Sequence, residues 1–247
     1  VEVHHHEGIA TLTFFHPKSN SLPGKVLASL AHTITEEGNR PENRVLVLKS
    51  KGEKAFCAGA SFDELLAIDN RAAADEFFMG FARVIQAIQK VPTFVIGRVQ
   101  GKAVGGGVGV AAATDYCLAH QSASVKLSEL AVGIGPFVVG PAVERKMGTS
   151  AFTDLAIHAT NWRSAQWARE KGLFMDVFES HEELDAAIGH LAQSLSESSP
   201  DAMRELKRIA WAGTEHWDHL LAERAAISGR LILEPTAREI LAGFRKA

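Results

Sequence analysis

Three consecutive glycines mark a place where the backbone of this chain can do chemistry. Gly105, Gly106 and Gly107 follow the apolar stretch Val95–Val99 and precede a run of small residues that can begin a helix. Glycine packs nothing and loses much conformational freedom on folding, so three in a row favour a left-handed turn or a close approach of the backbone to a ligand. The first N–H groups of a helix have no partner within it and carry the positive end of its dipole. An oxygen atom that gains negative charge would be stabilised there.

Two other interpretations of the glycine run are open from these residues alone. The first is a tight turn without a ligand. The second is dinucleotide binding, because residues 107–112 fit the pattern G-x-G-x-x-A and Glu129 follows at a suitable distance. In that pattern the glycines directly follow the strand, whereas Lys102–Val104 intervene here. The dinucleotide interpretation therefore fits the spacing poorly.

A second stretch, Lys51–Phe62, has a similar character. Its small, mostly apolar residues (KGEKAFCAGASF) allow backbone N–H groups to reach a ligand. Cys57 lies within it, but no histidine is near in sequence, and a small buried thiol is the commoner role for such a residue. Ser61 has the position of a helix N-cap, with Glu64 three residues later to complete a capping box.

One acidic residue in an apolar segment is the third feature, after the two glycine-containing segments, that could take part in a reaction. Glu129 is flanked by Leu127, Leu130 and Val132. An apolar environment disfavours the charged carboxylate and raises its pKa. A group that both takes and returns a proton benefits from a pKa near the working pH. We therefore expect Glu129 to act as an acid-base group, against the plainer alternative of a surface glutamate at a strand edge.

Composition excludes several classes of protein. The 247 residues are 46% hydrophobic and carry a formal net charge of -3, which is typical of a soluble globular chain without a broad nucleic-acid surface. No apolar run reaches the length of a membrane span, and no signal-peptide pattern is present at the N-terminus. Cys57 and Cys117 are the only cysteines, so no disulfide framework is indicated. We expect a cytoplasmic protein.

Alternating strands and helices must position these residues. Glu7-Gly8 predicts the turn of a hairpin over Val1–Phe15. The apolar stripe of Phe77–Gln89 predicts a core helix, and we interpret it as core and not as a cofactor site. Asp115 is interpreted as a structural hydrogen-bond acceptor. The other expected strands are Val45–Lys49, Thr93–Val99, Tyr116–Ala119 and Leu173–Phe178, and the other expected helices are Val26–Glu37, Phe62–Ile68, Val108–Ala113, Arg145–Gly148, Ser150–Ala159, Ser164–Lys171, His181–Leu195, Pro200–Trp211, Trp217–Leu233 and Thr236–Phe244.

Four ordered segments resemble those of the crotonase (enoyl-CoA hydratase/isomerase) superfamily. FCAGASF at 56–62 and QGKAVGGGVG at 100–109 are similar to its two oxyanion-hole segments. HPKSNSL at 16–22 is similar to its N-terminal P-x-x-N-x-L, and KLSELAVGIGP at 126–136 to its P-E-x-x-x-G segment. The resemblance spans essentially the whole chain.

The resemblance implies an α/β fold in two parts. Residues 1–190 would form a crotonase-like spiral of ββα units that holds an acyl-CoA site. Residues 191–247 would form a helical oligomerisation domain, because this part of the family packs against neighbouring subunits. A homotrimer or a dimer of trimers is the implied assembly.

The resemblance also implies roles for individual residues. The backbone N–H groups of Ala60 and Gly106 would bind the thioester carbonyl oxygen, and Glu129 would face the reacting carbons. No metal and no separate cofactor is implied, because coenzyme A is part of the substrate. The positions that match CoA-binding residues of the family are Lys18, Ala58, Phe62, Phe244 and Lys246.

Gly109 departs from the pattern of the family's hydratases. Hydratases commonly carry a second glutamate there, and the pair of carboxylates positions and deprotonates water. A single carboxylate can still move a proton between two carbons of one substrate, so we favour isomerisation of a 3-enoyl-CoA to a 2-enoyl-CoA. Hydration of a 2-enoyl-CoA, including a branched or methylglutaconyl-type one, remains an alternative if Asp63, Glu64 or Glu144 holds the water.

Two further alternatives differ in class. A non-catalytic acyl-CoA binder would keep the CoA cradle and form no product. A serine peptidase of the related Clp fold needs a nucleophilic serine where the glycines meet the helix, and Val108 and Gly109 stand there instead.

Overall fold

The computed structural model describes residues 1–244, with Phe244 described by its backbone alone. Six strands form the main sheet, in the order β1-β2-β3-β5-β7-β10. The β1–β2 pair is antiparallel and turns at Glu7-Gly8, as the sequence predicts, whereas the other pairs are parallel. The bounds are β1 Glu2–His6, β2 Ile9–Phe14, β3 Val45–Ser50, β5 Phe94–Val99, β7 Tyr116–His120 and β10 Asp176–Phe178.

A second sheet is built from four short strands in the order β4-β6-β8-β9. Three of them directly follow β3, β5 and β7 of the main sheet, so each repeat adds one strand to each sheet before a helix. This confirms the spiral of ββα units. Lys102–Val104, the residues that intervene between Val99 and the three glycines, form strand β6, which was not predicted. The bounds are β4 Ala55–Cys57, β6 Lys102–Val104, β8 Ser124–Lys126 and β9 Arg163–Ser164.

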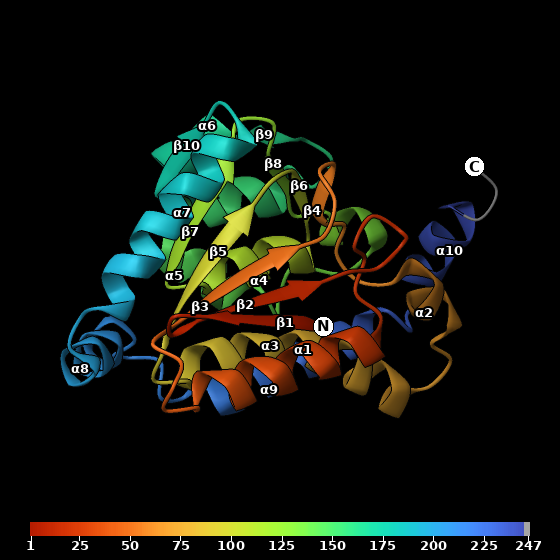
Figure 1. The fold of residues 1–247 in the computed structure, drawn as a ribbon. Helices are drawn as coiled ribbons and strands as arrows, with labels where there is room; N and C mark the ends of the chain where they lie inside the picture. The colour runs from red at the N-terminus through yellow and green to blue at the C-terminus, as the bar shows by residue number, and fades with distance from the viewer. Residues whose placement is uncertain (245–247) are drawn as a thin grey trace.

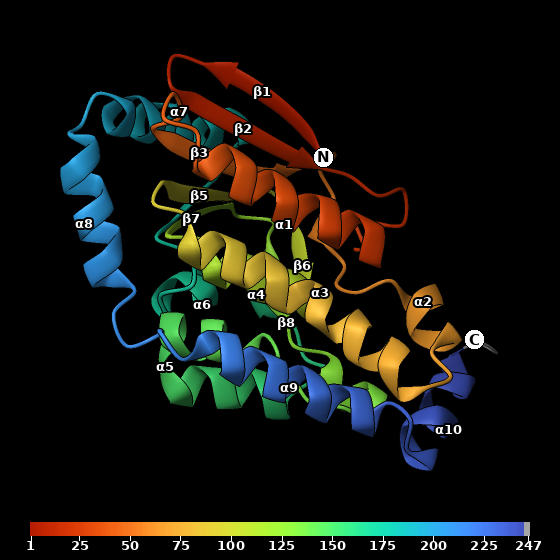
Figure 2. The same ribbon diagram turned by 90° about the horizontal axis from the view of Figure 1, so that it is seen from below.

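Helices cover both faces of the main sheet. Figure 2 shows α3 between α1 and α9, and these helices pack closely on one side. Helix α7 packs on the strands from the other side. The bounds are α1 Gly24–Gly38, α2 Phe62–Ala67, α3 Arg71–Lys90, α4 Gly106–Ala113, α5 Gly140–Ile157, α6 Ala165–Glu170, α7 His181–Ser196, α8 Pro200–Ala210, α9 Trp217–Leu231 and α10 Pro235–Phe244, with a 3-10 helix, η1, at Glu129–Val132.

The C-terminal helices pack onto the core of their own chain. Helix α9 lies along α3, and Figure 1 shows α8 at the opposite end of the molecule from α10. The expected boundary between residues 190 and 191 falls inside α7, which contacts strands β3, β5, β7 and β10. Among residues 1–244, no helix has both the length and the apolar character needed to cross a bilayer.

A buried ion pair attaches α8 to the sheet. Lys207 Nζ lies 2.9 Å from Asp115 Oδ2 and donates to the carbonyl oxygens of Ile88 and Thr93 at 2.8 Å. Asp115 also accepts a hydrogen bond from Trp211 Nε1 at 2.7 Å, which confirms it as a structural acceptor. Burial lowers the pKa of Lys207, and the nearby carboxylate of Asp115 opposes this shift.

Candidate active site

A cavity of about 180 Å³ lies where α3, η1, α9 and the N-terminus of α4 meet. Its wall is mostly apolar, and Glu129 is the one ionisable side chain among the described residues that line it. Serine hydroxyls at 128 and 228 supply the other polar side chains. The apolar part of the wall comprises Ala58, Ala60, Phe62, Leu65, Phe77, Phe78, Phe81, Val104, Val132, Ile134, Pro136, Phe137, Val138 and Val139.

Gly105 and Gly106 line this cavity, and no side chain fits at Gly106 or Gly107. Gly105 has φ of 51° and is the N-cap of α4. A Cβ on Gly106 would overlap the ring of Phe81, and a Cβ on Gly107 would lie 2.5 Å from the carbonyl oxygen of Cys57. The run is therefore more than a tight turn. The N–H of Gly106 belongs to the first turn of α4, where N–H groups have no partner within the helix.

The second glycine-containing segment meets the first at Gly59. A Cβ on Gly59 would lie 2.9 Å from Val104 O and 3.8 Å from the backbone nitrogen of Gly106. Leu22 forms a parallel bridge with Ala60 through the C=O of Gly59 and the N–H of Ser61. In such a bridge the N–H of the central residue points to the opposite side, so the N–H of Ala60 points away from Leu22. Ala60 and Gly106 both line the cavity.

The carboxyl group of Glu129 lies against the N-terminus of α4. Its Oε1 would be 2.9 Å from a Cβ placed on Gly105. Its Oε2 is buried and has no hydrogen-bond partner among residues 1–244. Burial raises the pKa of Glu129 to about 7, although a backbone hydrogen bond acts to lower it. The raised pKa agrees with the apolar flanks seen in the sequence and suits a group that exchanges protons near neutral pH.

The space beside Gly109 is already filled. A Cβ on Gly109 would overlap the side chain of Val139, a residue that also lines the cavity. A second carboxylate at position 109 therefore has no room while Val139 is in place. Phe137, two residues earlier, also lines the cavity.

The other acidic candidates point elsewhere. Asp63 forms an ion pair with Lys18. Glu64 Oε2 accepts the backbone N–H of Gly24 at 2.7 Å, so Glu64 reaches α1 and does not complete the capping box expected with Ser61. Glu144 Oε1 accepts a 2.6 Å hydrogen bond from Thr149. None of these three acidic residues is among the described residues that line the cavity.

The residues expected to contact CoA are only partly brought together. Ala58 and Phe62 line the cavity, and Phe62 is 37% exposed. Lys18 lies on the surface and pairs with Asp63. Phe244 ends α10 with its side chain outside the described part of the chain, and Lys246 lies outside the described residues altogether.

Sequence reasoning missed part of the cavity wall. The interpretation of the Phe77–Gln89 stripe as core is confirmed, but Phe77, Phe78 and Phe81 also line the cavity, which was not predicted. A helical stripe shows that one face is covered but not whether protein or a ligand covers it. Ser228 of α9 was also missed, since a lone serine in a helix carries no sequence signal.

The amino-acid sequence of the chain matches the profile of a known protein family. The profile described as enoyl-CoA hydratase/isomerase matches residues 4–236. The chain belongs to the enoyl-CoA hydratase/isomerase family. Curated members of the family that resemble it include the carnitinyl-CoA dehydratases of Salmonella paratyphi A and Salmonella agona. Each is 30% identical over 207 residues, covering 84% of this chain and 78% of the relative.

Solved structures of the family share the fold. An enoyl-CoA hydratase from Mycobacterium avium aligns with a TM-score of 0.84 at 27% identity, covering 97% of this chain and 91% of that one. An enoyl-CoA hydratase from Bacillus halodurans aligns with a TM-score of 0.90 over 98% of both chains at 19% identity, a likeness of fold alone. The expected crotonase fold is thereby confirmed for this member of the enoyl-CoA hydratase/isomerase family.

Proposed function

We propose that this protein isomerises a 3-enoyl-CoA to a 2-enoyl-CoA. The observation that carries the proposal is the single ionisable side chain, Glu129, among the described residues of a mostly apolar cavity. The filled space beside Gly109 supports it, because a second carboxylate to orient water is missing from that position. The acyl-CoA substrate is consistent with the family to which the chain belongs.

The proposed reaction moves one proton and leaves the composition of the substrate unchanged. The carboxylate of Glu129 removes a proton from C2 of the 3-enoyl thioester, and the electron pair forms a dienolate. The carboxylic acid then returns a proton to C4, while the double bond shifts from C3–C4 to C2–C3. The dienolate oxygen is held by the N–H groups of Ala60 and Gly106, which carry its developing charge in a largely dry site. Each such donor contributes roughly 3 kcal/mol to stabilising the transition state.

Hydration of a 2-enoyl-CoA is the second candidate, favoured by the hydratase and dehydratase names of the relatives. In that reaction Glu129 alone would take a proton from water while the oxygen adds to C3, and would then give the proton to C2. Val139, which fills the space beside Gly109, argues against it, because the described residues of this part of the cavity wall offer no polar side chain to hold a water molecule.

The two candidates are separated by offering one substrate at a time. A 3-enoyl-CoA should give a gain in conjugated-thioester absorbance, with a product of unchanged mass. A 2-enoyl-CoA should show no loss of that absorbance beyond the reverse isomerisation. Loss with the 2-enoyl-CoA and a product heavier by one water would instead establish hydration, and acyl-CoA binding without either product would establish a non-catalytic binder.

The pH dependence of turnover should show one ionisation. Because burial raises the pKa of Glu129 to about 7 and the proposed first step needs its carboxylate, kcat/KM should rise with pH and level off above about 7. Below pH 6 we expect about a tenfold loss per pH unit. Initial rates from pH 5 to 9 measure this, and a plateau that extends down to pH 5 would contradict a raised pKa at the catalytic group.

The ionisation of Glu129 should also make the free energy of unfolding depend on pH. The folded-state pKa of about 7 lies above the ordinary value of 4.5, so the buried carboxylate costs stability increasingly as pH rises from 4.5 to 7. Glu129→Gln should therefore be more stable than the wild type by about 2 to 3 kcal/mol at pH 8, with a much smaller difference at pH 5. Urea unfolding at both pH values tests this, and equal differences at the two would contradict it.

The proposal includes a cytoplasmic location and assembly into a homotrimer or a dimer of trimers. Leu206 and Ile209 support the assembly, because both side chains are about 60% exposed on α8 and would be covered by a partner. Light scattering on the purified chain measures the number of subunits.

A further inference from the structure

Ser228 places an unpaired hydroxyl group in the wall of the cavity. The residue lies on α9, is only 1% exposed, and lines the cavity. Within residues 1–244 its hydroxyl makes no hydrogen bond, whereas Thr35 and Thr114, also helical or helix-capping, each bond a backbone carbonyl of their own helix. A buried hydroxyl without a partner costs free energy, so it points to a partner that the ligand supplies.

The hydroxyl group of Ser228 lies at a distance from the backbone N–H groups of Ala60 and Gly106, in the direction of the N-terminus of helix α3. Arg71 Nη2 donates to the carbonyl oxygen of Ala226 at 3.1 Å, and a Cβ on Gly229 would overlap the carboxylate of Asp75. Residues 226–229 of α9 therefore lie beside the first turns of α3. Phe81, which lies against Gly106, comes six residues after Asp75, or about 9 Å farther along the helix axis. An acyl chain whose thioester lies at Gly106 would reach Ser228 with its remote part.

The residues around Ser228 determine which charge the remote part of the acyl group can carry. Phe77, Phe78 and Leu65 supply apolar wall, and no described lining residue other than Glu129 is ionisable. The described wall of the cavity offers a carboxylate no cationic side chain and an ammonium group only Glu129, so either charge is costlier to bury there than a neutral oxygen. A hydroxyl or keto oxygen needs only the single partner that Ser228 provides.

We propose that the acyl group of the substrate carries a neutral oxygen, as a hydroxyl or keto group, at its end remote from the thioester, and that Ser228 hydrogen-bonds it. This inference rests on the proposed function of the cavity as an acyl-CoA site. It makes Ser228 a specificity-determining residue.

The test compares matched acyl-CoAs on the full-length protein. Several chain lengths are offered as 3-enoyl-CoAs, each with and without a terminal hydroxyl group, to the wild type, to Ser228→Ala and to Ser194→Ala, a control on the exposed face of α7. At the best chain length the wild type and the control should prefer the hydroxylated substrate at least about tenfold in kcat/KM. Ser228→Ala should lose this preference.

Binding of the saturated analogues gives a readout that does not need turnover. Their Kd values, measured by calorimetry, should show the same tenfold preference in the wild type and none in Ser228→Ala. A hydroxyl preference in binding without turnover would sustain the role of Ser228 and overturn the proposed isomerisation. Turnover with an unchanged ratio in Ser228→Ala, or a wild type that prefers the plain chain at every length, would overturn the role of Ser228 and leave the isomerisation standing.

Discussion

Glu129→Gln should lower kcat for isomerisation at least about 1,000-fold while Kd for a saturated acyl-CoA stays within about threefold. The amide keeps the shape of the side chain but cannot accept the C2 proton, and loss of a positioned acid-base group typically costs two to four orders of magnitude. The cavity offers no substitute among its described residues, because Glu129 is the one ionisable side chain that lines it. Stopped-flow absorbance and calorimetry measure the two quantities.

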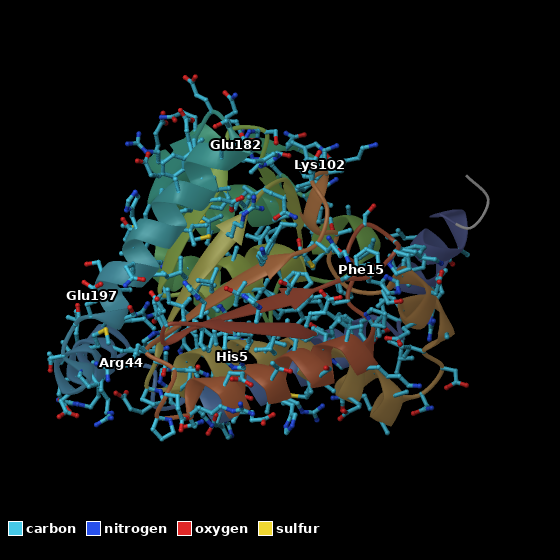
Figure 3. The ribbon with its side chains drawn as sticks, in the orientation of Figure 1. His5, Phe15, Arg44, Lys102, Glu182 and Glu197 are labelled. Carbon is cyan, nitrogen blue, oxygen red and sulfur yellow. The ribbon has the colours of Figure 1, made fainter. Side chains whose placement is uncertain are left out.

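A matched glutamate far from the cavity controls for general effects of the substitution. Glu182 lies in the first turn of α7, and Figure 3 shows it at the end of the molecule occupied by that helix. Glu182→Gln should leave kcat unchanged. Retention of more than about a tenth of wild-type kcat by Glu129→Gln would mean that another group moves the proton.

Lys207→Met should lower the free energy of unfolding by about 3 to 5 kcal/mol. The substitution leaves the carboxylate of Asp115 buried without its ammonium partner, 2.9 Å away in the wild type, and two carbonyl oxygens lose their donor. Such an orphaned buried charge costs more than the original pair contributes. Urea unfolding of the variant, followed by tryptophan fluorescence, measures the loss, since Trp211 itself donates to Asp115.

Two comparisons make this result specific to the buried pair. Lys25 on α1 is exposed, so Lys25→Met should change stability by less than about 0.5 kcal/mol. Adding Asp115→Asn to Lys207→Met should recover part of the loss, because it removes the unpaired charge. Equal stabilities of Lys25→Met and Lys207→Met would show that the pair does not hold α8 in place.

The parts of the fold with long periodic signals were predicted well from the sequence. The apolar run at Val45 marks a strand that is covered on both faces, and the helical stripe of α3 marks one covered face; both elements form in the expected regions. Helix α3 begins earlier, at Arg71, because the side chain of Asn70 accepts the N–H of Ala73 and caps a polar first turn. The strands of the second sheet are two or three residues long, too short for any period, so β6 was not predicted.

The residues of the candidate site also differ in how far the sequence predicts them. Glycine runs and an isolated acid among apolar residues leave a signal in the sequence, and Ala60, Gly106 and Glu129, which all line the cavity, were predicted from them and from the family resemblance. Val139 and Ser228 were not predicted, because the role of each depends on residues that are distant in sequence and close in space: Val139 fills the space beside Gly109, and Ser228 is buried beside the cavity. Glu64 shows the same limit, since a capping-box spacing did not prevent its carboxylate from bonding to Gly24 of another helix.

The most direct test of the account is an experimental structure with a saturated acyl-CoA bound. We expect the thioester oxygen to lie 2.7 to 3.1 Å, the usual distance in an oxyanion hole, from the backbone nitrogens of both Ala60 and Gly106. We also expect the carboxyl group of Glu129 to be in contact with C2 and C4 of the acyl chain. A thioester oxygen bound to other groups, or a carboxyl group turned away from C2, would contradict the account.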